Sequence, residues 1–217
     1  MRILITSGGT KVPIDDVRFI GNMSSGKYGA LLCEDFSRLG IGVSFLCAKG
    51  SKISEYHQIG IYNGDISSSI HYFNDFDSYK DTAITLVDKN KFDIIISAAA
   101  VSDYVMDKTV GKISSDDELV LRLKKAPKIL PLLKETSPNS VIVGFKLLVS
   151  PTEEQKLTAI KKVLVSGTDM VVYNDLTEIR KGYTKRFLYD SSMSETVCDT
   201  SSALAINILD QYNKIKK

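Results

Sequence analysis

The chain has 217 residues, which is enough for one generous domain or two very small ones. Hydrophobic residues make up 43% and charged residues 25% of the chain, which excludes wholesale disorder and fibrous structure. The 28 lysines and arginines exceed the 26 acidic residues by a net charge of only +2, which argues against a protein that mainly grips nucleic acid or an anionic membrane.

Apolar runs and turn residues predict strands that alternate with helices. In chain order the predicted elements are strand 3–6, helix 27–39, strand 43–47, strand 59–62, helix 77–90, strand 93–97, a mobile loop 101–117, strand 119–124, helix 127–134, strand 141–145, a helix from Pro151, strand 169–173, a hairpin of strands 186–189 and 195–197, and helix 201–217. Such alternation is typical of βαβ units. We therefore predict an α/β, Rossmann-like fold, with a mostly parallel twisted sheet, helices on both faces and a small antiparallel hairpin, in one domain over 1–217.

Ligands of open α/β sheets bind beyond the carboxyl ends of the strands, and four segments fall there. They are Ser7–Thr10, Ser97–Asp103, Gly144–Lys146 and Asn174–Asp175. In the first segment, Gly8 and Gly9 permit a tight turn whose backbone N–H groups can face an anion. A plain strand-to-loop turn explains the same glycines equally well.

Residues 21–28 nearly match the phosphate-binding pattern G-x-x-x-x-G-K-S/T. Tyr28 stands where the pattern needs a short hydroxyl that reaches Mg²⁺, so we reject a true P-loop. Lys27 still lies in the first turn of a predicted helix, where a cation opposes the helix dipole unless an anion is bound. A solvated surface lysine is the alternative. The predicted phosphate-binding residues are Gly8, Gly9, Thr10, Ser24, Ser25, Gly26 and Lys27.

The segment 97–104 ends the strand at 93–97 with three alanines, which let a flat ligand lie close to the backbone. Asp103 can hold a ribose hydroxyl or a metal, or it can simply cap a helix. Tyr104 and Lys108 fit the Y-x-x-x-K pattern of nicotinamide reductases. No G-x-G-x-x-G follows the first strand, however, and no acid follows the strand 43–47, which counts against NAD(P). A Rossmann-type reductase or a non-catalytic nucleotide-binding module stays as the alternative function.

Lys112 follows Gly111 in the polar loop. A lysine on a glycine-hinged flap can close over a reacting phosphate. A lone loop lysine is usually a bystander, so this residue gains weight only from its context.

Cys33, Cys47 and Cys198 have no metal-ligand spacing, and neither His57 nor His71 has a Cys or His close by. A zinc site is therefore not expected, and the odd cysteine count suits a reducing compartment. The start of the sequence lacks the apolar core of a signal peptide, and no apolar run reaches membrane-spanning length. We predict a cytoplasmic enzyme with no membrane or nucleic-acid partner and no metal-ligating side chains identified in its sequence.

Five motif segments occur in order: Ile5–Pro13, Val17–Lys27, Ser97–Tyr104, Val143–Lys146 and Asn174–Asp175. Together they resemble the phosphopantothenate–cysteine ligase family. Any one segment is a weak signal, but five in order are a strong one. The length leaves no room for the flavin decarboxylase domain that is often fused to these ligases, so the resemblance is to the free-standing form.

The resemblance implies an enzyme of coenzyme A biosynthesis that ligates cysteine to 4'-phosphopantothenate. The substrate carboxylate would attack the α-phosphate of CTP with loss of pyrophosphate, and the cysteine amine would then displace CMP from the acyl-cytidylate. Mg²⁺ is the implied cofactor, and ATP stays possible in place of CTP. A homodimer is also implied, with the 186–198 hairpin or the 119–124 strand as its interface. Since two anions must meet, we expect cations and backbone N–H groups at the site.

The family motifs also imply roles for individual residues. Asn22 matches the asparagine that supports cysteine transfer, and Lys112 matches the first lysine of a flap motif that is important for activation. The implied nucleotide-binding residues are Ser97, Ala98, Ala99, Asp103, Lys112, Pro127, Lys128, Ile129, Leu130, Phe145 and Lys162. The chain departs from the family where two further flap lysines are missing after Lys112, at Ser166 in place of a second lysine, and after Phe145, where an acid is common.

Overall fold

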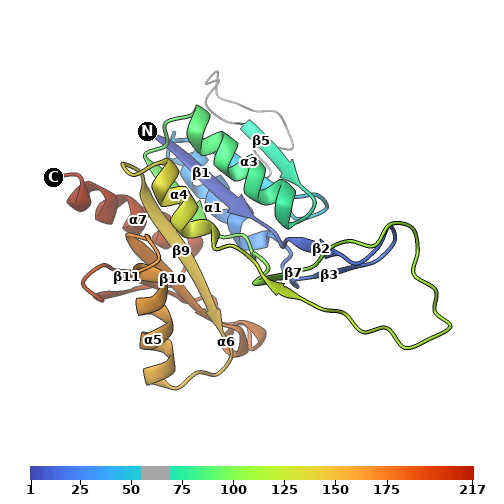
Figure 1. The fold of residues 1–217 in the computed structure, drawn as a ribbon. Coiled ribbons are helices and arrows are strands. Elements are labelled where there is room, and N and C mark those ends of the chain that lie inside the picture. Colours follow the sequence, from blue (N-terminus) through green and yellow to red (C-terminus); the bar gives the residue numbers. More distant parts are fainter. Residues whose placement is uncertain (55–68) are drawn as a thin grey trace.

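The computed structural model describes residues 1–54 and 69–217, so the strand predicted over 59–62 lies outside the described residues. Eight of the described strands form one sheet (Figure 1). They are β1 (Arg2–Ser7), β4 (Gly42–Ala48), β5 (Ser69–Phe73), β6 (Ile94–Ser97), β9 (Val141–Leu148), β10 (Met170–Asp175), β11 (Arg186–Asp190) and β12 (Glu195–Cys198). The helices are α1 (Lys27–Arg38), α3 (Phe76–Lys89), α4 (Ile129–Thr136), α5 (Glu153–Leu164), α6 (Leu176–Arg180) and α7 (Ser201–Ile215). Two small hairpins join β2 (Lys11–Pro13) to β3 (Phe19–Gly21) and β7 (Tyr104–Val105) to β8 (Lys124–Lys125).

The strand order of the sheet is β12-β11-β10-β9-β6-β1-β4-β5. Neighbours from β5 to β10 are parallel, and β11 and β12 add an antiparallel edge. The chain runs outward from β1 to β5 and then crosses back to β6 on the other side of β1. Doubly wound sheets bind their ligands at such a switch point. The predicted α/β, Rossmann-like fold is confirmed.

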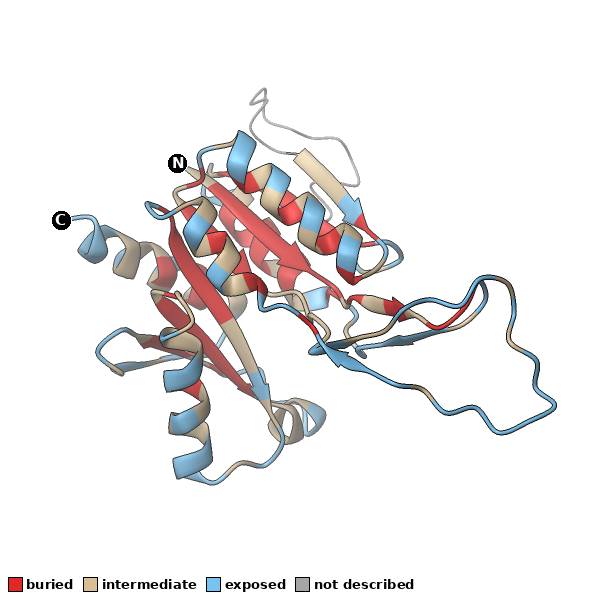
Figure 2. Cartoon of the chain, in the orientation of Figure 1, coloured by how far each residue is buried: buried red, intermediate tan, exposed pale blue. Residues whose placement is uncertain are grey.

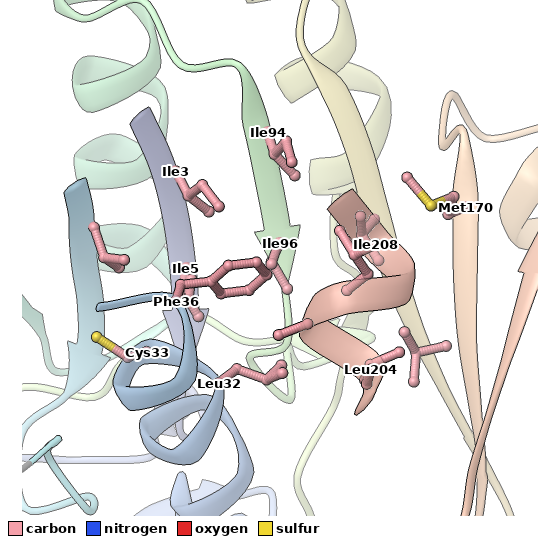
Figure 3. Close-up of a cluster of buried hydrophobic side chains, with 14 of the residues drawn as sticks. Ile3, Ile5, Leu32, Cys33, Phe36, Ile94, Ile96, Met170, Leu204 and Ile208 are labelled. Carbon is pink, nitrogen blue, oxygen red and sulfur yellow. The ribbon is translucent and has the colours of Figure 1, made fainter. Parts of the chain in front are cut away.

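Helices cover both faces of the sheet, and the inner strands β1, β4, β6 and β10 are almost entirely buried (Figure 2). On one face, α1 and α7 bury Phe36 and Ile208 against a layer that includes Ile5 (Figure 3). On the other face, α3 and α4 bury Tyr79 and Leu133, and α5 covers β9 and β10. Two apolar layers thus fix the positions of the strand ends.

Several helices begin where the sequence supplies a cap or a glycine. Asp75, Thr152 and Thr200 each accept a backbone N–H in the first turns of α3, α5 and α7. The first helix, α1, has no side-chain cap and begins after Gly26, whose φ is 72°. Residues with a Cβ adopt that conformation at a cost of about 1–2 kcal/mol, so the glycine determines how the chain enters α1.

The main departure from the predicted elements lies between β7 and β8. Residues 106–123, which we call the arm, extend from the sheet alongside the β2–β3 hairpin (Figure 1). The strand predicted over 119–124 is wrong, because only Lys124 of that segment lies in a strand. Leu119, Val120 and Leu123 stay 42%, 74% and 45% exposed. An alternating segment becomes a strand only when a neighbour pairs with its backbone, and the described part of the chain supplies no such neighbour.

Candidate functional site

A cleft of about 1210 Å³ lies beyond the carboxyl ends of β6 and β9. Its walls are the loop 97–103 after β6, the segment 126–131 that enters α4, the end of β9 at 145–148, and one side of α5. Asn22, from the loop before α1, completes the lining. The location agrees with the rule that placed ligands at these strand ends.

The cleft brings together many of the residues that the sequence analysis selected. Those that line it are Asn22, Ser97, Ala99, Asp103, Pro127, Lys128, Ile129, Leu130, Phe145 and Lys162. Ala98 does not line it and packs against the hydrophobic layer under α1 and α7. Residues 8–10, 24–27 and Lys112 also lie outside the lining.

The Gly8–Thr10 loop is tied to the loop after β6. Thr10 N donates to Ala100 O at 3.1 Å, and Ala100 N donates to Gly8 O at 2.8 Å. The Thr10 hydroxyl accepts a hydrogen bond from Ser102 N at 2.8 Å and lies 2.9 Å from the Ser102 hydroxyl. Because the Thr10 N–H is already donated to Ala100 O and Thr10 is fully buried, this one N–H does not face an anion. The phosphate-binding roles of Gly8 and Gly9 stay predictions. The loop has a structural role here, and it fixes one wall of the cleft.

Asn22 is held at the cleft by a contact that crosses from the loop before α1 to the loop after β6. Its Nδ2 donates to Ala100 O at 2.8 Å, although the side chain is exposed. The backbone at Asn22 passes so close to Gly9 that position 9 requires a glycine, since a Cβ there would lie 2.6 Å from Asn22 O. The carboxamide is therefore fixed by backbone geometry at the edge of the cleft.

The segment Ser24–Lys27 leads into α1 on the other side of Asn22. Ser7 Oγ donates to Gly26 O at 2.9 Å, which anchors the turn to the end of β1. Lys27 is exposed, and the first turn of α1 holds no acidic residue. The helix dipole there meets no negative side chain, and the phosphate-binding role of this segment stays a prediction.

Three lysines and two carboxylates line the cleft. They are Lys128, Lys146, Lys162, Asp103 and Glu154. Lys128 Nζ lies 2.5 Å from Asp103 Oδ1, but the two side chains are 71% and 70% exposed, so solvent screens the pair. Within the described part of the chain, Lys146 and Lys162 make no ion pair, which leaves both charges available to an anionic ligand. The sequence analysis placed Lys146 in a strand-end segment, Gly144–Lys146, but gave it no individual role, although its place directly after Phe145 was a usable signal.

Phe145 is supported from behind by the first turn of α1. Its ring makes an edge contact with Tyr28, with centroids 6.1 Å apart, and the Arg186 guanidinium lies 4.7 Å from the Tyr28 ring centre. Burial raises the pKa of the Tyr28 phenol well above its ordinary value, so this group stays neutral. The residue that rules out a P-loop thus acts as backing for an aromatic wall of the cleft.

The lining helix α5 is held to the sheet by Lys156. Its ammonium lies 5.6 Å, 5.8 Å and 5.9 Å from the ring centres of Tyr173, Phe187 and Tyr189. It also forms an ion pair with Glu153 at 2.8 Å. A cation among three aromatic rings ties α5 to β10 and β11 and so fixes the wall that carries Lys162.

Lys112 lies in the arm, outside the cleft of its own chain, and its side chain is exposed. The sequence analysis gave Lys112 a place on a flap over the reacting phosphate and a role in nucleotide binding with Asp103, which requires it to meet Asn22 and Asp103 at one site. The structure brings Asn22 and Asp103 together at one cleft but does not bring Lys112 to them. The reason is that the arm runs with the β2–β3 hairpin, away from the strand ends (Figure 1).

Residues 1–54 and 69–217 contain no group of three or more His, Cys, Asp or Glu residues that could hold a metal ion. Over the same residues, none of the helices has the length and apolar character needed to cross a membrane. Any Mg²⁺ at the cleft would therefore depend on Asp103, Glu154 and the phosphates of a ligand, which is how Mg²⁺ is commonly held.

These features define a doubly wound α/β protein with a large cleft at the switch-point edge, lined by small residues, an aromatic ring and three lysines. The chain belongs to the family described as the DNA/pantothenate metabolism flavoprotein C-terminal domain, whose model matches residues 1–213. This membership agrees with the resemblance drawn from the five sequence segments.

Similar proteins cover almost the whole chain. The coenzyme A biosynthesis bifunctional protein CoaBC of Methanocaldococcus jannaschii is 33% identical over 219 residues, which is 100% of this chain and 51% of that protein. The chain thus spans about half the length of the curated relative. A solved DNA/pantothenate metabolism flavoprotein from Streptococcus pneumoniae is 28% identical with a TM-score of 0.84, and covers 99% of both chains. A Cab2 variant in complex with phosphopantothenate-cysteine has a TM-score of 0.84 over 98% of this chain and 86% of its own, and at 20% identity it supports the fold alone.

Proposed function

We propose that the chain is a phosphopantothenate–cysteine ligase of coenzyme A biosynthesis. The carboxylate of 4'-phosphopantothenate attacks the α-phosphate of CTP, and pyrophosphate leaves. The cysteine amine then attacks the acyl carbonyl of the acyl-cytidylate, and CMP leaves with the formation of phosphopantothenoylcysteine. The family membership and the CoaBC relatives support this proposal.

The single observation that carries the proposal is the convergence of Asn22, the 97–103 loop, Phe145 and Lys162 on one cleft. The volume of about 1210 Å³ is larger than a small-molecule site usually is, as a nucleotide and a second substrate together require. Both substrates are anions. Lys146 and Lys162, with Mg²⁺ on the nucleotide phosphates, supply the positive charge that lets them approach one another.

Each part of the cleft has a proposed role. Phe145, Pro127–Leu130 and the alanines after β6 hold the nucleotide, with Lys128 and Lys162 beside its charged groups. Asn22 orients the acyl-cytidylate for cysteine transfer, and Ser24–Lys27 at the start of α1 bind a phosphate. ATP is the other nucleotide that this arrangement admits.

We further propose a homodimer that involves the arm. The arm carries four large apolar side chains that are exposed, which is unusual for a surface that stays in water: Val110, Leu119, Val120 and Leu123.

The position of Lys112 also bears on the dimer. Because Lys112 lies outside the cleft of its own chain, its activating role requires either movement of the arm or the cleft of a second copy. Mixing Asn22→Asp and Lys112→Gln chains separates these cases, and we expect activity to return in mixed dimers. A mixture as inactive as either variant alone contradicts action across copies.

The alternative reductase function loses its motif in the structure. Lys108 Nζ lies 2.5 Å from Asp16 Oδ1, and Tyr104 lies in β7, paired with β8. The Y-x-x-x-K spacing therefore does not produce a tyrosine–lysine pair. Among the two functions, the geometry favours the ligase.

The dependence of protein stability on added nucleotide tests the proposal. At about 100 times its Kd, CTP with Mg²⁺ is expected to raise the free energy of unfolding by about 2.7 kcal/mol, while NADH and NADPH leave it unchanged. ATP serves as the matched nucleotide. Stabilisation by NADPH but not by CTP or ATP would refute the ligase.

The two half-reactions are tested with variants of the two residues that are assigned to them. Lys112→Gln is expected to lose pyrophosphate release from CTP and phosphopantothenate. Asn22→Asp is expected to release pyrophosphate but to transfer the acyl group slowly to cysteine, because a carboxylate cannot donate to Ala100 O and adds a negative charge beside an anion. If both variants keep full activity, the assigned site is wrong.

A further inference from the structure

Both chain neighbours of Lys112 are held by the turn 14–18 between β2 and β3. Gly111 N donates to Asp16 Oδ2 at 2.7 Å, and Asp16 N donates back to Gly111 O at 3.0 Å. On the other side, Ile113 N donates to Asp15 Oδ2 at 3.1 Å, and Arg18 Nη2 donates to Ile113 O at 2.9 Å. The backbone on each side of Lys112 therefore has both its donor and its acceptor engaged.

The turn that provides these partners is itself well ordered by hydrogen bonds. Asp15 is only 3% exposed, and its Oδ1 accepts the backbone N–H groups of Val17 and Arg18, both at 2.8 Å. Its Oδ2 lies 2.5 Å from Arg18 Nη2. These bonds, led by the one from Arg18, hold the pKa of Asp15 well below its ordinary value, so the carboxylate stays charged at neutral pH. Asp16 is fixed in turn by Lys108 at 2.5 Å.

The lysine between these anchors is unengaged. Lys112 is exposed and makes no hydrogen bond or ion pair with any residue in 1–54 or 69–217. Gly111 has a φ of 82° and nothing within 4 Å of its ideal Cβ position, so it is needed for the backbone conformation and not for space. A fixed backbone thus presents one free ammonium group.

We propose that Asp15 and Asp16 are positioning residues, which hold Gly111 and Ile113 so that Lys112 is presented to the reacting phosphate from a preset backbone. This inference rests on the activating role proposed for Lys112. Gly111 then acts as a fixed corner of the chain and not as the hinge that its sequence suggests. Pre-ordering this backbone removes an entropic cost from the activation step, which depends on the placement of one charge.

The test compares two clamp variants with a control on the same arm. Asp16→Ala removes the bonds to Gly111 N and Lys108, and Asp15→Asn weakens the bonds to Ile113 N and Arg18. Asp107→Ala is the matched control, since Asp107 is also an arm carboxylate paired with a lysine, Lys124, at 2.5 Å, but does not touch the neighbours of Lys112. Thermal unfolding of each variant shows that the fold is retained, and Asp16→Ala, at an exposed position, keeps the test valid if Asp15→Asn fails to fold.

The readout is the single-turnover release of pyrophosphate from CTP and phosphopantothenate without cysteine. We expect Asp16→Ala to slow it about tenfold, since misplacing a catalytic group by about 1 Å costs up to about a hundredfold. Cysteine transfer to preformed acyl-cytidylate should stay within about twofold of the unmodified protein, as should both steps in Asp107→Ala. In a Lys112→Gln background, Asp16→Ala should cause no further loss, because residues that act through one another are not additive.

The outcomes separate the inference from the proposed function. If Lys112→Gln alone keeps full activity, the activating role of Lys112 fails, and the positioning role fails with it. If Lys112→Gln is inactive in the first step but Asp16→Ala and Asp15→Asn are as fast as Asp107→Ala, the activating role stands and the positioning role is overturned. An equal loss from Asp16→Ala with or without Lys112 also overturns it, since the effect then does not pass through the lysine.

Discussion

The Thr10 hydroxyl forms hydrogen bonds between the loop after β1 and the loop after β6. The loss of free energy of unfolding when it is removed can be calculated. Thr10→Val keeps the volume of the side chain but removes the acceptor of Ser102 N and the bond to the Ser102 hydroxyl. Thr10 is fully buried, so water does not replace the lost acceptor. Each lost hydrogen bond lowers the free energy of unfolding by about 0.5–1.5 kcal/mol, and a buried N–H left without an acceptor lowers it by about 1–3 kcal/mol. Either way of counting gives about 2 kcal/mol for Thr10→Val.

Urea and thermal unfolding measure this cost. In a chain of this size about 2 kcal/mol lowers Tm by about 4–8 °C, and the urea midpoint should fall with an unchanged slope. Ser102→Ala is the matched control, because it removes only the bond between the two hydroxyls and should cost about 1 kcal/mol or less. CTP affinity should also fall in Thr10→Val, because the 97–103 wall loses its anchor. Equal stability of Thr10→Val and the unmodified protein would refute the reasoning.

Three further predictions concern packing, pH and charge. Gly144→Ala places a Cβ 2.8 Å from Val163 Cγ1, so overpacking against α5 should lower the free energy of unfolding by about 1–3 kcal/mol in urea and weaken CTP binding. The pKa of Asp15 is lowered in the folded state, so the charged carboxylate stabilises the fold above the unfolded pKa of about 3.9, and this stabilisation is lost as the pH falls below it. In urea unfolding between pH 7 and pH 3, the free energy of unfolding should therefore fall less steeply in Asp15→Asn than in the unmodified protein. Lys162→Gln should weaken CTP binding in low salt by about tenfold without changing Tm, whereas an unchanged affinity at low salt excludes a phosphate contact.

The buried parallel strands were predictable because they are read from local sequence. Runs such as 43–47 and 93–97 are nearly continuous in apolar residues, which is what a strand covered on both faces requires. Once those strands are placed, the rule for strand ends selects Ser97–Asp103 and Phe145, and both line the cleft. The fold and the place of the cleft thus follow from the sequence alone.

The elements that sequence reasoning missed depend on distant partners. The edge strand β5 is only partly buried and carries polar residues, while β2 and β3 gain their form by pairing with each other and by contact with the arm. The helix α6 spans five residues, which is too short for a periodic signal. The tie from Thr10 to Ser102 joins residues 92 positions apart, and no local pattern announces it.

The glycine loop has a packing role that its motif alone did not indicate. A Cβ at Gly8 would lie 2.7 Å from Ala48 Cβ, and a Cβ at Gly9 would lie 2.6 Å from Asn22 O, so both glycines are needed for close packing. Gly8 O and Thr10 N form hydrogen bonds with the loop after β6. The side-chain charge available to an anionic ligand at the cleft comes from lysines outside this loop, among them Lys146 and Lys162. Rigid loops then set the geometry while exposed lysines set the charge, so substitutions in the first group should change stability and substitutions in the second should change affinity or rate.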